Sequence, residues 1–407
     1  MDAHIHEMTP LLPEQAEVLQ DLALDVIQKS ATLGSRQHPS TLRSLKEFLR
    51  IINSYYSNLI EGHNTHPHDI VRAMHKNYDS EPAKRNLQLE SLAHIAVQQE
   101  MEIKLETEPV LNIASPEFLC HIHRGFYLGV PEEFQVVRDI AMERESRVSP
   151  GKLRDEEVRA GTHVPPEHET LPAFLRRFAE VYDPLKHHGA AKLVAAAAAH
   201  HRLMWIHPFL DGNGRVTRLF TEAYLIRIPV HGFGLWSISR GLARKNAEYK
   251  AALAEADNPR RNDLDGRGSL SNEALVKFCR FFLNICLDQV EYMGSLLRLE
   301  GLLDRIRQYI RMRDSGMIPQ PRNGKKLRKE AASMLQEVLI HGESSRGHVI
   351  AASGLKERTG RDLLGQLLHE GLLVSDSPKG EVGIGFPVHA AGWYFPELYT
   401  MRSESPS

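Results

Sequence analysis

The sequence predicts a mainly α-helical protein, and three observations carry that prediction. Apolar residues recur every three or four positions through most of the 407 residues, whereas the alternation typical of strands is short and local. The apolar share of 42% and the charged share of 25% are those of a globular protein that buries a sizeable core. The length, at about 150 residues per domain, predicts two or three domains.

The first strongly periodic helix is predicted over residues 41–60. Its apolar positions, from Leu42 to Leu59, are three or four apart, and Ser40 and Gly62 suit its two ends. An alanine-rich helix is expected at 190–204. Further helices are expected at 69–75, 82–105, 116–129, from 171 onward, 216–228, 239–256 and 272–313.

Two segments break the helical pattern. Residues 144–166 are punctuated by Ser, Pro and Gly, which predicts a loop with a short β-hairpin. Residues 207–214 hold a proline and two glycines and separate the helices on either side.

The composition shifts after residue 300. Residues 301–329 contain nine Lys or Arg against two Asp, a local surplus of seven positive charges. Helices are then expected at 331–340, 349–354 and 357–370, followed by a hairpin over 372–387. Helix, turn, helix and hairpin is the order of a winged helix-turn-helix, which predicts such a module at the C-terminal end.

Charge and cysteine content exclude several classes of protein. A net charge of −2 argues against a uniformly basic nucleic-acid coat, and three cysteines without CxxC spacing form neither a disulfide framework nor a thiolate zinc site. The histidine pairs also lack zinc-site spacing, so we expect no metal role for them. The start of the chain lacks signal-peptide features, and the longest apolar run, Leu193–Ala199, is far shorter than the about 20 residues of a membrane helix. We therefore expect a cytoplasmic protein without a membrane partner.

The segment 207–218 combines features that suit a phosphate ligand. Gly212 and Gly214 allow backbone N–H groups to converge as an anion nest, and the start of the following helix adds its positive dipole end. Arg215 and Arg218 carry guanidinium groups that match phosphate oxygens.

Two further residues of this segment suit a reaction on that ligand. Asp211 could hold a Mg²⁺ ion that bridges phosphates, and His207 has the ordinary pKa of a general base, about 6.5. Together the residues predict binding of a nucleotide polyphosphate with a metal and deprotonation of an incoming nucleophile. By itself, the glycine turn is more often an ordinary turn, and the His-Pro-Phe corner is more often part of a core. The combination of these features within twelve residues favours the functional interpretation.

The segment His207–Arg218 resembles the signature of the Fic family, HxFx(D/E)GNGRxxR, and matches it at every specified position. The resemblance covers residues 116–284 and implies a Fic-type helical bundle core with a short β-hairpin flap. It implies a protein adenylyltransferase that moves AMP from ATP to a Ser, Thr or Tyr hydroxyl, with His207 as the base and Asp211 as the Mg²⁺ ligand. The implied nucleotide-binding residues are Phe209, Gly212, Asn213, Gly214, Arg215, Arg218, Asn246 and Tyr249. The family's flap, which pairs with the target by strand addition, corresponds to Gly161, Thr162, His163 and Val164; an ordinary surface loop is the alternative.

The segment Ser57–Gly62 resembles the family's inhibitory motif, (S/T)xxxE(G/N). Ser57 and Glu61 are four residues apart and so share one face of the predicted helix. The resemblance implies that Glu61 pairs with Arg218 and blocks the productive pose of ATP. By itself, the pattern also matches many ordinary helix ends.

These expectations define four parts of the chain. They are an N-terminal helical region with the inhibitory helix at 1–114, a Fic catalytic domain at 115–300, a basic helical linker at 301–329 and the winged helix-turn-helix at 330–407. The expected cofactors are ATP and Mg²⁺. The expected partners are a target protein, the chain itself, a second copy in a homodimer, and DNA through the winged helix. A solvated linker followed by a protein-interaction or dimerisation module is the alternative to DNA binding. Alternatives are a DNA-binding regulator that uses the core as a nucleotide sensor, or a Fic enzyme with deAMPylation or phosphotransfer activity.

Overall fold

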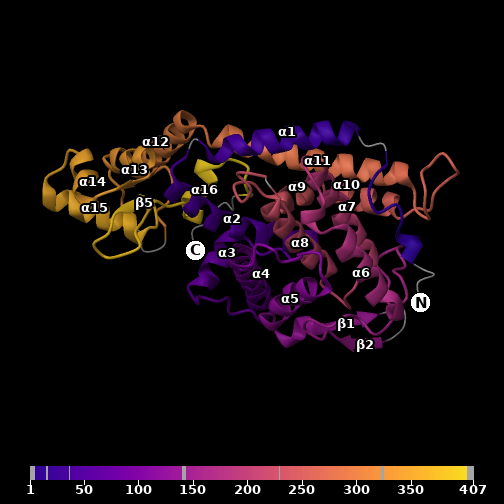
Figure 1. Ribbon diagram of the computed structural model, residues 1–407. Helices are drawn as coiled ribbons and strands as arrows, with labels where there is room; N and C mark the ends of the chain where they lie inside the picture. The colour runs from indigo at the N-terminus through magenta and orange to yellow at the C-terminus, as the bar shows by residue number, and fades with distance from the viewer. Residues whose placement is uncertain are drawn as a thin grey trace. The chain divides into compact units, whose positions relative to one another are not determined.

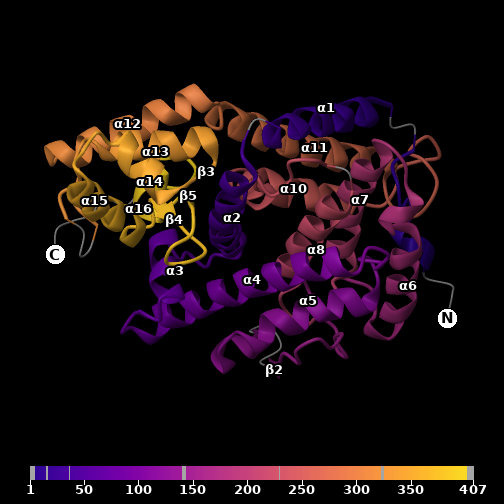
Figure 2. The same cartoon turned by 60° about the vertical axis from the view of Figure 1, so that its left-hand side comes forward.

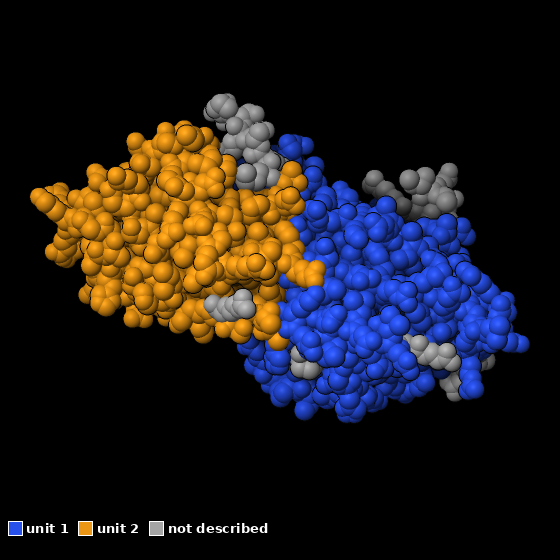
Figure 3. Space-filling view, turned by 90° about the horizontal axis from the view of Figure 1, so that it is seen from above, with its two compact units in different colours: residues 1–30, 53–233, 237–290 blue, residues 31–52, 234–236, 291–407 orange. Residues whose placement is uncertain are grey.

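The structure is a computed structural model that describes residues 5–14, 17–35, 37–139, 144–228, 230–321 and 325–400. It is mainly helical, as predicted, with helices α1–α16 and five short strands in two antiparallel sheets (Figure 1). Two compact units divide the chain: residues 1–30, 53–233 and 237–290 form unit 1, and residues 31–52, 234–236 and 291–407 form unit 2 (Figure 3). The predicted domain boundaries remain predictions.

Unit 1 is built around two helices buried on nearly all sides. In α7 (Ala191–Ile206) every residue from Leu193 to Leu203 is buried, and in α8 (Asn213–Arg227) burial extends from Arg215 to Leu225. Helices that are buried all round belong to the centre of a domain. The loop 207–212, which joins these two helices, is therefore attached at both ends to the buried centre of the unit.

The other helices of unit 1 cover this centre. α4 (Pro82–Thr107) packs against both α5 (Pro116–Leu128) and α8, and Figure 2 shows α4 and α5 side by side. The other α-helices in unit 1 are α3 (Pro67–Met74), α6 (Leu171–Val181), α9 (Ile238–Arg244) and α10 (Asn246–Ala256), together with parts of α1 (Glu17–Gly34), α2 (Pro39–Ile60) and α11 (Asn272–Leu296).

The hairpin of unit 1 lies earlier than predicted. Strands β1 (Val136–Asp139) and β2 (Arg144–Arg147) pair antiparallel, with Val136 opposite Arg147. In the predicted flap, the described residues form a single bridge between Ala160 and His163.

Unit 2 contains the C-terminal module. Along the chain, α13 (Ala331–His341) is followed by β3 (Glu343–Ser344), then by α14 (Arg346–Ala352) and α15 (Glu357–His369), and then by β4 (Leu373–Val374) and β5 (Val382–Ile384). The three strands form one sheet in the order β3-β5-β4. α16 (Val388–Tyr394) follows the sheet, and α12 (Leu299–Ser315) packs against α13 and α16. Arg313 of α12 is fully buried and paired with Glu370, so part of the basic segment is internal to this unit.

Two helices that were predicted as continuous are each broken. The stretch 239–256 divides at Lys245, and the stretch 272–313 divides after α11, where Arg298 is extended. At the second break, side chains satisfy the terminal carbonyls: Gln37 Nε2 donates to Leu297 O at 2.7 Å, and Arg305 donates to Leu296 O. Periodicity could not reveal this break, because apolar spacing continues across it and the capping side chains lie elsewhere in the chain. Among the described residues, no helix is long and apolar enough to span a bilayer.

Candidate functional site

The loop between α7 and α8 is locked by its own side chains. His207 ends α7 in the left-handed region (φ 50°), and Gly212 precedes α8 in the same region (φ 78°). The Asn213 amide accepts from Phe209 N at 2.9 Å and donates to Phe209 O at 2.8 Å. The buried Phe209 ring stacks on His123 with 4.1 Å between centroids. Phe209 and Asn213 therefore shape the loop from inside.

His207 is presented as a neutral base. Its Nδ1 lies 3.2 Å from Met204 O, a contact that places the ring proton on Nδ1 and leaves the Nε2 lone pair free. Burial lowers the pKa of His207 to about 4, so the ring is uncharged at neutral pH. Arg154 donates from Nε to the His207 carbonyl at 2.9 Å, which fixes the backbone that carries the ring.

Asp211 is the exposed carboxylate of the loop. Its Oδ2 accepts from the Tyr127 hydroxyl at 2.6 Å and lies 3.5 Å from Arg215 Nη2, and 41% of the side chain is exposed. Burial raises the pKa of this carboxyl, but Arg215 and the Tyr127 hydroxyl outweigh burial and hold the pKa below its usual value. Mg²⁺ is typically bound by one or two carboxylates plus phosphate oxygens, so a single accessible, ionised carboxylate fits that ion.

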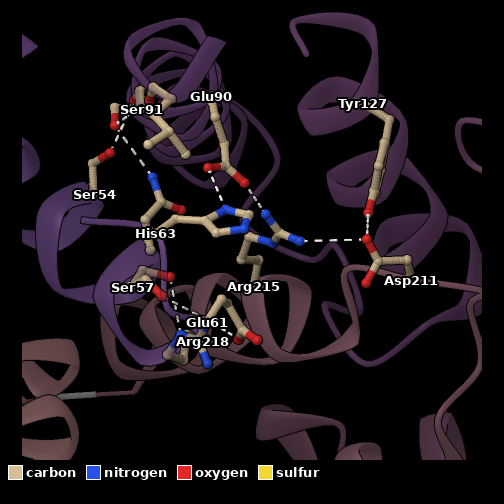
Figure 4. A network of polar contacts seen from close by, with 12 residues as sticks. Ser54, Ser57, Glu61, His63, Glu90, Ser91, Tyr127, Asp211, Arg215 and Arg218 are labelled. Carbon is tan, nitrogen blue, oxygen red and sulfur yellow. Dashed lines mark hydrogen bonds and ion pairs between the residues drawn. The ribbon is translucent and has the colours of Figure 1, made fainter. Parts of the chain in front are cut away.

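Arg215 is held on three sides. Its Nη1 is paired with Glu90, its Nη2 faces Asp211, and its guanidinium lies 4.9 Å above the Phe126 ring. The second oxygen of Glu90 lies 2.7 Å from His63 Nδ1, and this contact raises the pKa of His63 despite its partial burial. Figure 4 shows this network, in which Glu90 lies between His63 and Arg215.

Arg218 is occupied by residues at the end of α2. Its Nη2 lies 2.6 Å from Glu61 Oε1 and 3.0 Å from the Ser57 carbonyl, and its Nε donates to Ser57 Oγ at 2.9 Å (Figure 4). Arg218 is 1% exposed. Burial raises the pKa of Glu61, but Arg218 and Arg215 outweigh it, and the pKa is lowered, so the carboxylate is charged. The structure therefore brings together the two motifs that the sequence places 157 residues apart.

Two glycines at the start of α8 are in close contact with neighbouring side chains. A Cβ on Gly212 would lie 2.8 Å from the Tyr127 ring, and a Cβ on Gly214 would meet the Glu61 carboxylate. The Glu61 carboxylate thus lies against the first turn of α8, where free N–H groups and the helix dipole favour an anion.

Tyr249 and Asn246 lie on α10. Tyr249 is 2% exposed, its hydroxyl is 2.7 Å from His200 Nε2, and Arg218 is close enough to lower its pKa against the larger effect of burial. The buried Oδ1 of Asn246 has no hydrogen-bond partner within the described part of the chain. Tyr249 is therefore near Arg218, and Asn246 offers an unused acceptor on the same helix.

The predicted flap residues face two ways. Gly161, Thr162 and Val164 are exposed. His163 instead turns inward, with its Nε2 2.8 Å from Trp205 O and its Nδ1 3.5 Å from Asp257. The His163 side chain thus anchors the segment to the core, and the other three residues remain accessible.

Sequence reasoning missed four residues of this site: His63, Glu90, Tyr127 and Arg154. Three of them lie outside the signature and the inhibitory motif on separate elements, and His63 directly follows the inhibitory motif. A signal existed for Glu90 alone, because it shares a helix face with Val97, Met101 and Leu105, where a lone carboxylate among apolar residues indicates a buried partner.

Comparison with known proteins identifies the region around this site. Residues 113–225 match the model of the Fic/DOC family. Proteins named protein adenylyltransferase Fic are 38% identical in Drosophila grimshawi and 36% identical in Drosophila mojavensis, each over 77 residues. These matches cover 19% of this chain and 16% and 15% of the relatives, so the chain matches only a small part of their length.

Two solved structures share the fold. A Fic family protein from Desulfovibrio desulfuricans is 16% identical with a TM-score of 0.52, covering 90% of this chain and 96% of that one. Fic-1 (residues 134–508) from C. elegans is 18% identical with a TM-score of 0.51, covering 68% and 72%. At these identities the likeness concerns the fold.

Proposed function

Because this chain is a Fic domain family protein, we propose that it is a protein adenylyltransferase, which moves AMP from ATP to a Ser, Thr or Tyr hydroxyl and is held inactive by Glu61. One observation carries the proposal. The base, the metal-type carboxylate and two arginines converge at the start of α8, while the Glu61 carboxylate lies against the same helix turn.

The reaction follows from the placement of the side chains. The neutral Nε2 of His207 accepts the proton of the target hydroxyl, whose oxygen then bonds to the α-phosphorus as the bond to pyrophosphate breaks. The N–H groups of the α8 turn, Arg215 and Arg218 bind the phosphates. Asp211 would hold Mg²⁺, which when bound supplies positive charge to the phosphate oxygens. The exposed residues of the flap would bind the target backbone by strand addition.

Inhibition by Glu61 has two physical causes. The carboxylate uses the guanidinium of Arg218 that the terminal phosphate of ATP needs, and its negative charge lies where that phosphate would enter. A charge-assisted hydrogen bond of this kind contributes about 1.5–3 kcal/mol. The bond therefore lowers the fraction of molecules in which Arg218 is free of Glu61 by roughly 10–150-fold.

The test compares label from the two ends of ATP. The native protein, Glu61→Gly and His207→Ala are incubated with Mg²⁺, cell lysate, and ATP labelled at the α- or γ-phosphate. Glu61→Gly is expected to transfer α-label to lysate proteins or to itself at least tenfold faster than the native chain, and His207→Ala is expected to bind ATP without transfer. Glu106→Gln, an exposed carboxylate of α4, serves as the matched control.

Other results of this experiment would support one of the alternative functions. Transfer of γ-label would indicate phosphotransfer instead, and release of AMP from a labelled target by the native protein would indicate deAMPylation. ATP binding without any transfer by Glu61→Gly would favour the nucleotide sensor.

DNA remains a proposed partner of the C-terminal module. The order of α13–α15 with the sheet β3-β5-β4 supports it, and Arg358 and Arg361 are exposed on α15. Residues 330–399 contain five Lys or Arg against nine Asp or Glu, however, so phosphate contacts would depend on α15 and the basic residues of 325–329. A DNA complex that weakens steeply between low and moderate salt would support this partner, and absence of binding at low salt would exclude it.

A further inference from the structure

Glu90 is a fully buried carboxylate between two elements of the candidate site. It lies on α4 with no exposed surface, and its two oxygens bind different partners, Arg215 on α8 and His63 in the turn after α2 (Figure 4). Burying a carboxylate in this way is costly unless charges and hydrogen bonds compensate it. We therefore ask what this buried carboxylate does at the site.

Two carboxylates compete for the same guanidinium. Arg215 is in direct contact with Glu90, whereas its distance to Asp211 is 3.5 Å, which is too long for a strong charge-assisted hydrogen bond. The Phe126 ring beneath Arg215 limits movement on a third side. The guanidinium is thus satisfied mainly by Glu90, and Asp211 keeps 41% of its side chain exposed.

The position of Glu90 does not depend on Arg215 alone. His63 binds its second oxygen, and Ser91, the next residue on α4, accepts from Asn58 Nδ2 at 3.3 Å. Ser54 donates to the Ser91 carbonyl at 2.9 Å. Because α4 is attached to the end of α2 and the following turn at two adjacent residues, the Glu90 carboxylate is held in place independently of Arg215.

We propose that Glu90 is a positioning residue, which holds Arg215 and thereby keeps the Asp211 carboxylate available for a divalent cation. Without the Glu90 charge, the buried guanidinium has Asp211 as its nearest remaining anion and closes the 3.5 Å gap to it. Asp211 is then neutralised by an internal ion pair. This inference rests on the proposed function, since it takes ATP with Mg²⁺ as the ligand.

The test measures the effect of Mg²⁺ on ATP binding. Glu61→Gly/His207→Ala is the background, because it leaves Arg218 open and prevents turnover. The dissociation constant of ATP is measured by calorimetry in excess MgCl₂ and in EDTA, with Glu90→Gln, Glu90→Asp or the control Glu106→Gln added. The readout is the ratio of affinity with Mg²⁺ to affinity in EDTA, which a general loss of packing would leave unchanged.

Glu90→Gln is expected to reduce this ratio by about tenfold, as losses of residues that orient a metal ligand typically do. Glu90→Asp keeps the charge on a shorter side chain and is expected to give an intermediate ratio, and Glu106→Gln is expected to change nothing. If Glu90→Gln does not melt cooperatively, Glu90→Asp decides the question. A ratio equal to that of the background would overturn the role of Glu90 and leave the proposed function standing. A background that binds no ATP would overturn both.

Discussion

Replacement of His94 by leucine is expected to make the protein less sensitive to acid. His94 lies on α4, is 1% exposed, and neither of its ring nitrogens has a hydrogen-bond partner among the residues described. Burial, followed by the charges of Arg218 and Arg215, lowers its pKa to about 3. The folded protein therefore keeps this ring neutral at a pH where the unfolded chain, with a pKa of about 6.5, protonates it.

The size of the effect follows from that difference. Because the folded pKa is the lower one, the unfolded state binds more protons, and stability falls as the pH drops through 6.5. Between pH 7.5 and pH 5 the protonation of His94 in the unfolded chain costs the native state about 2 kcal/mol. The other buried histidines titrate alike in the native chain and in His94→Leu, so their contribution cancels in the comparison.

Urea unfolding at the two pH values measures this difference. The loss of unfolding free energy between pH 7.5 and pH 5 is expected to be about 2 kcal/mol smaller in His94→Leu than in the native chain. His75→Leu, at an exposed histidine, is the control and is expected to keep the native pH dependence. Equal pH dependence in His94→Leu and the native chain would refute the argument that burial keeps this ring neutral.

Three further predictions concern stability and positioning. Glu370→Leu is expected to destabilise unit 2 by about 3–5 kcal/mol in thermal melting, because it leaves the fully buried Arg313 charge unpaired; an unchanged melting temperature would contradict this. Gly212→Ala is expected to cost about 1–3 kcal/mol in urea unfolding, because the new Cβ meets the Tyr127 ring in a left-handed backbone; native stability would argue against that strain. In the Glu61→Gly background, Arg154→Lys is expected to slow the proposed AMP transfer about 10–100-fold with ATP binding retained, because a lysine cannot hold three carbonyls at once; the rate of the background itself would exclude a positioning role.

The helical class and most helix positions could be predicted because amphipathic spacing is a local property. The same reasoning failed where a break depends on distant partners. The end of α11 is stabilised by Gln37 and Arg305, which no periodicity connects to residues 296–297. The inward turn of His163 is a similar case, since its partners Trp205 and Asp257 come from other elements.

The chemistry of the loop could be predicted from local sequence. A base, a carboxylate, two turn-forming glycines and two arginines lie within twelve residues, and their spacing predicts a phosphate site without reference to the rest of the chain. The pairing of Glu61 with Arg218 was implied by the resemblance of the two motifs, whereas the partner of Arg215 became evident only from the tertiary structure. Glu90 is separated from Arg215 by 125 residues, and its carboxylate acts on the guanidinium only because packing of α4 against α8 removes water from between them.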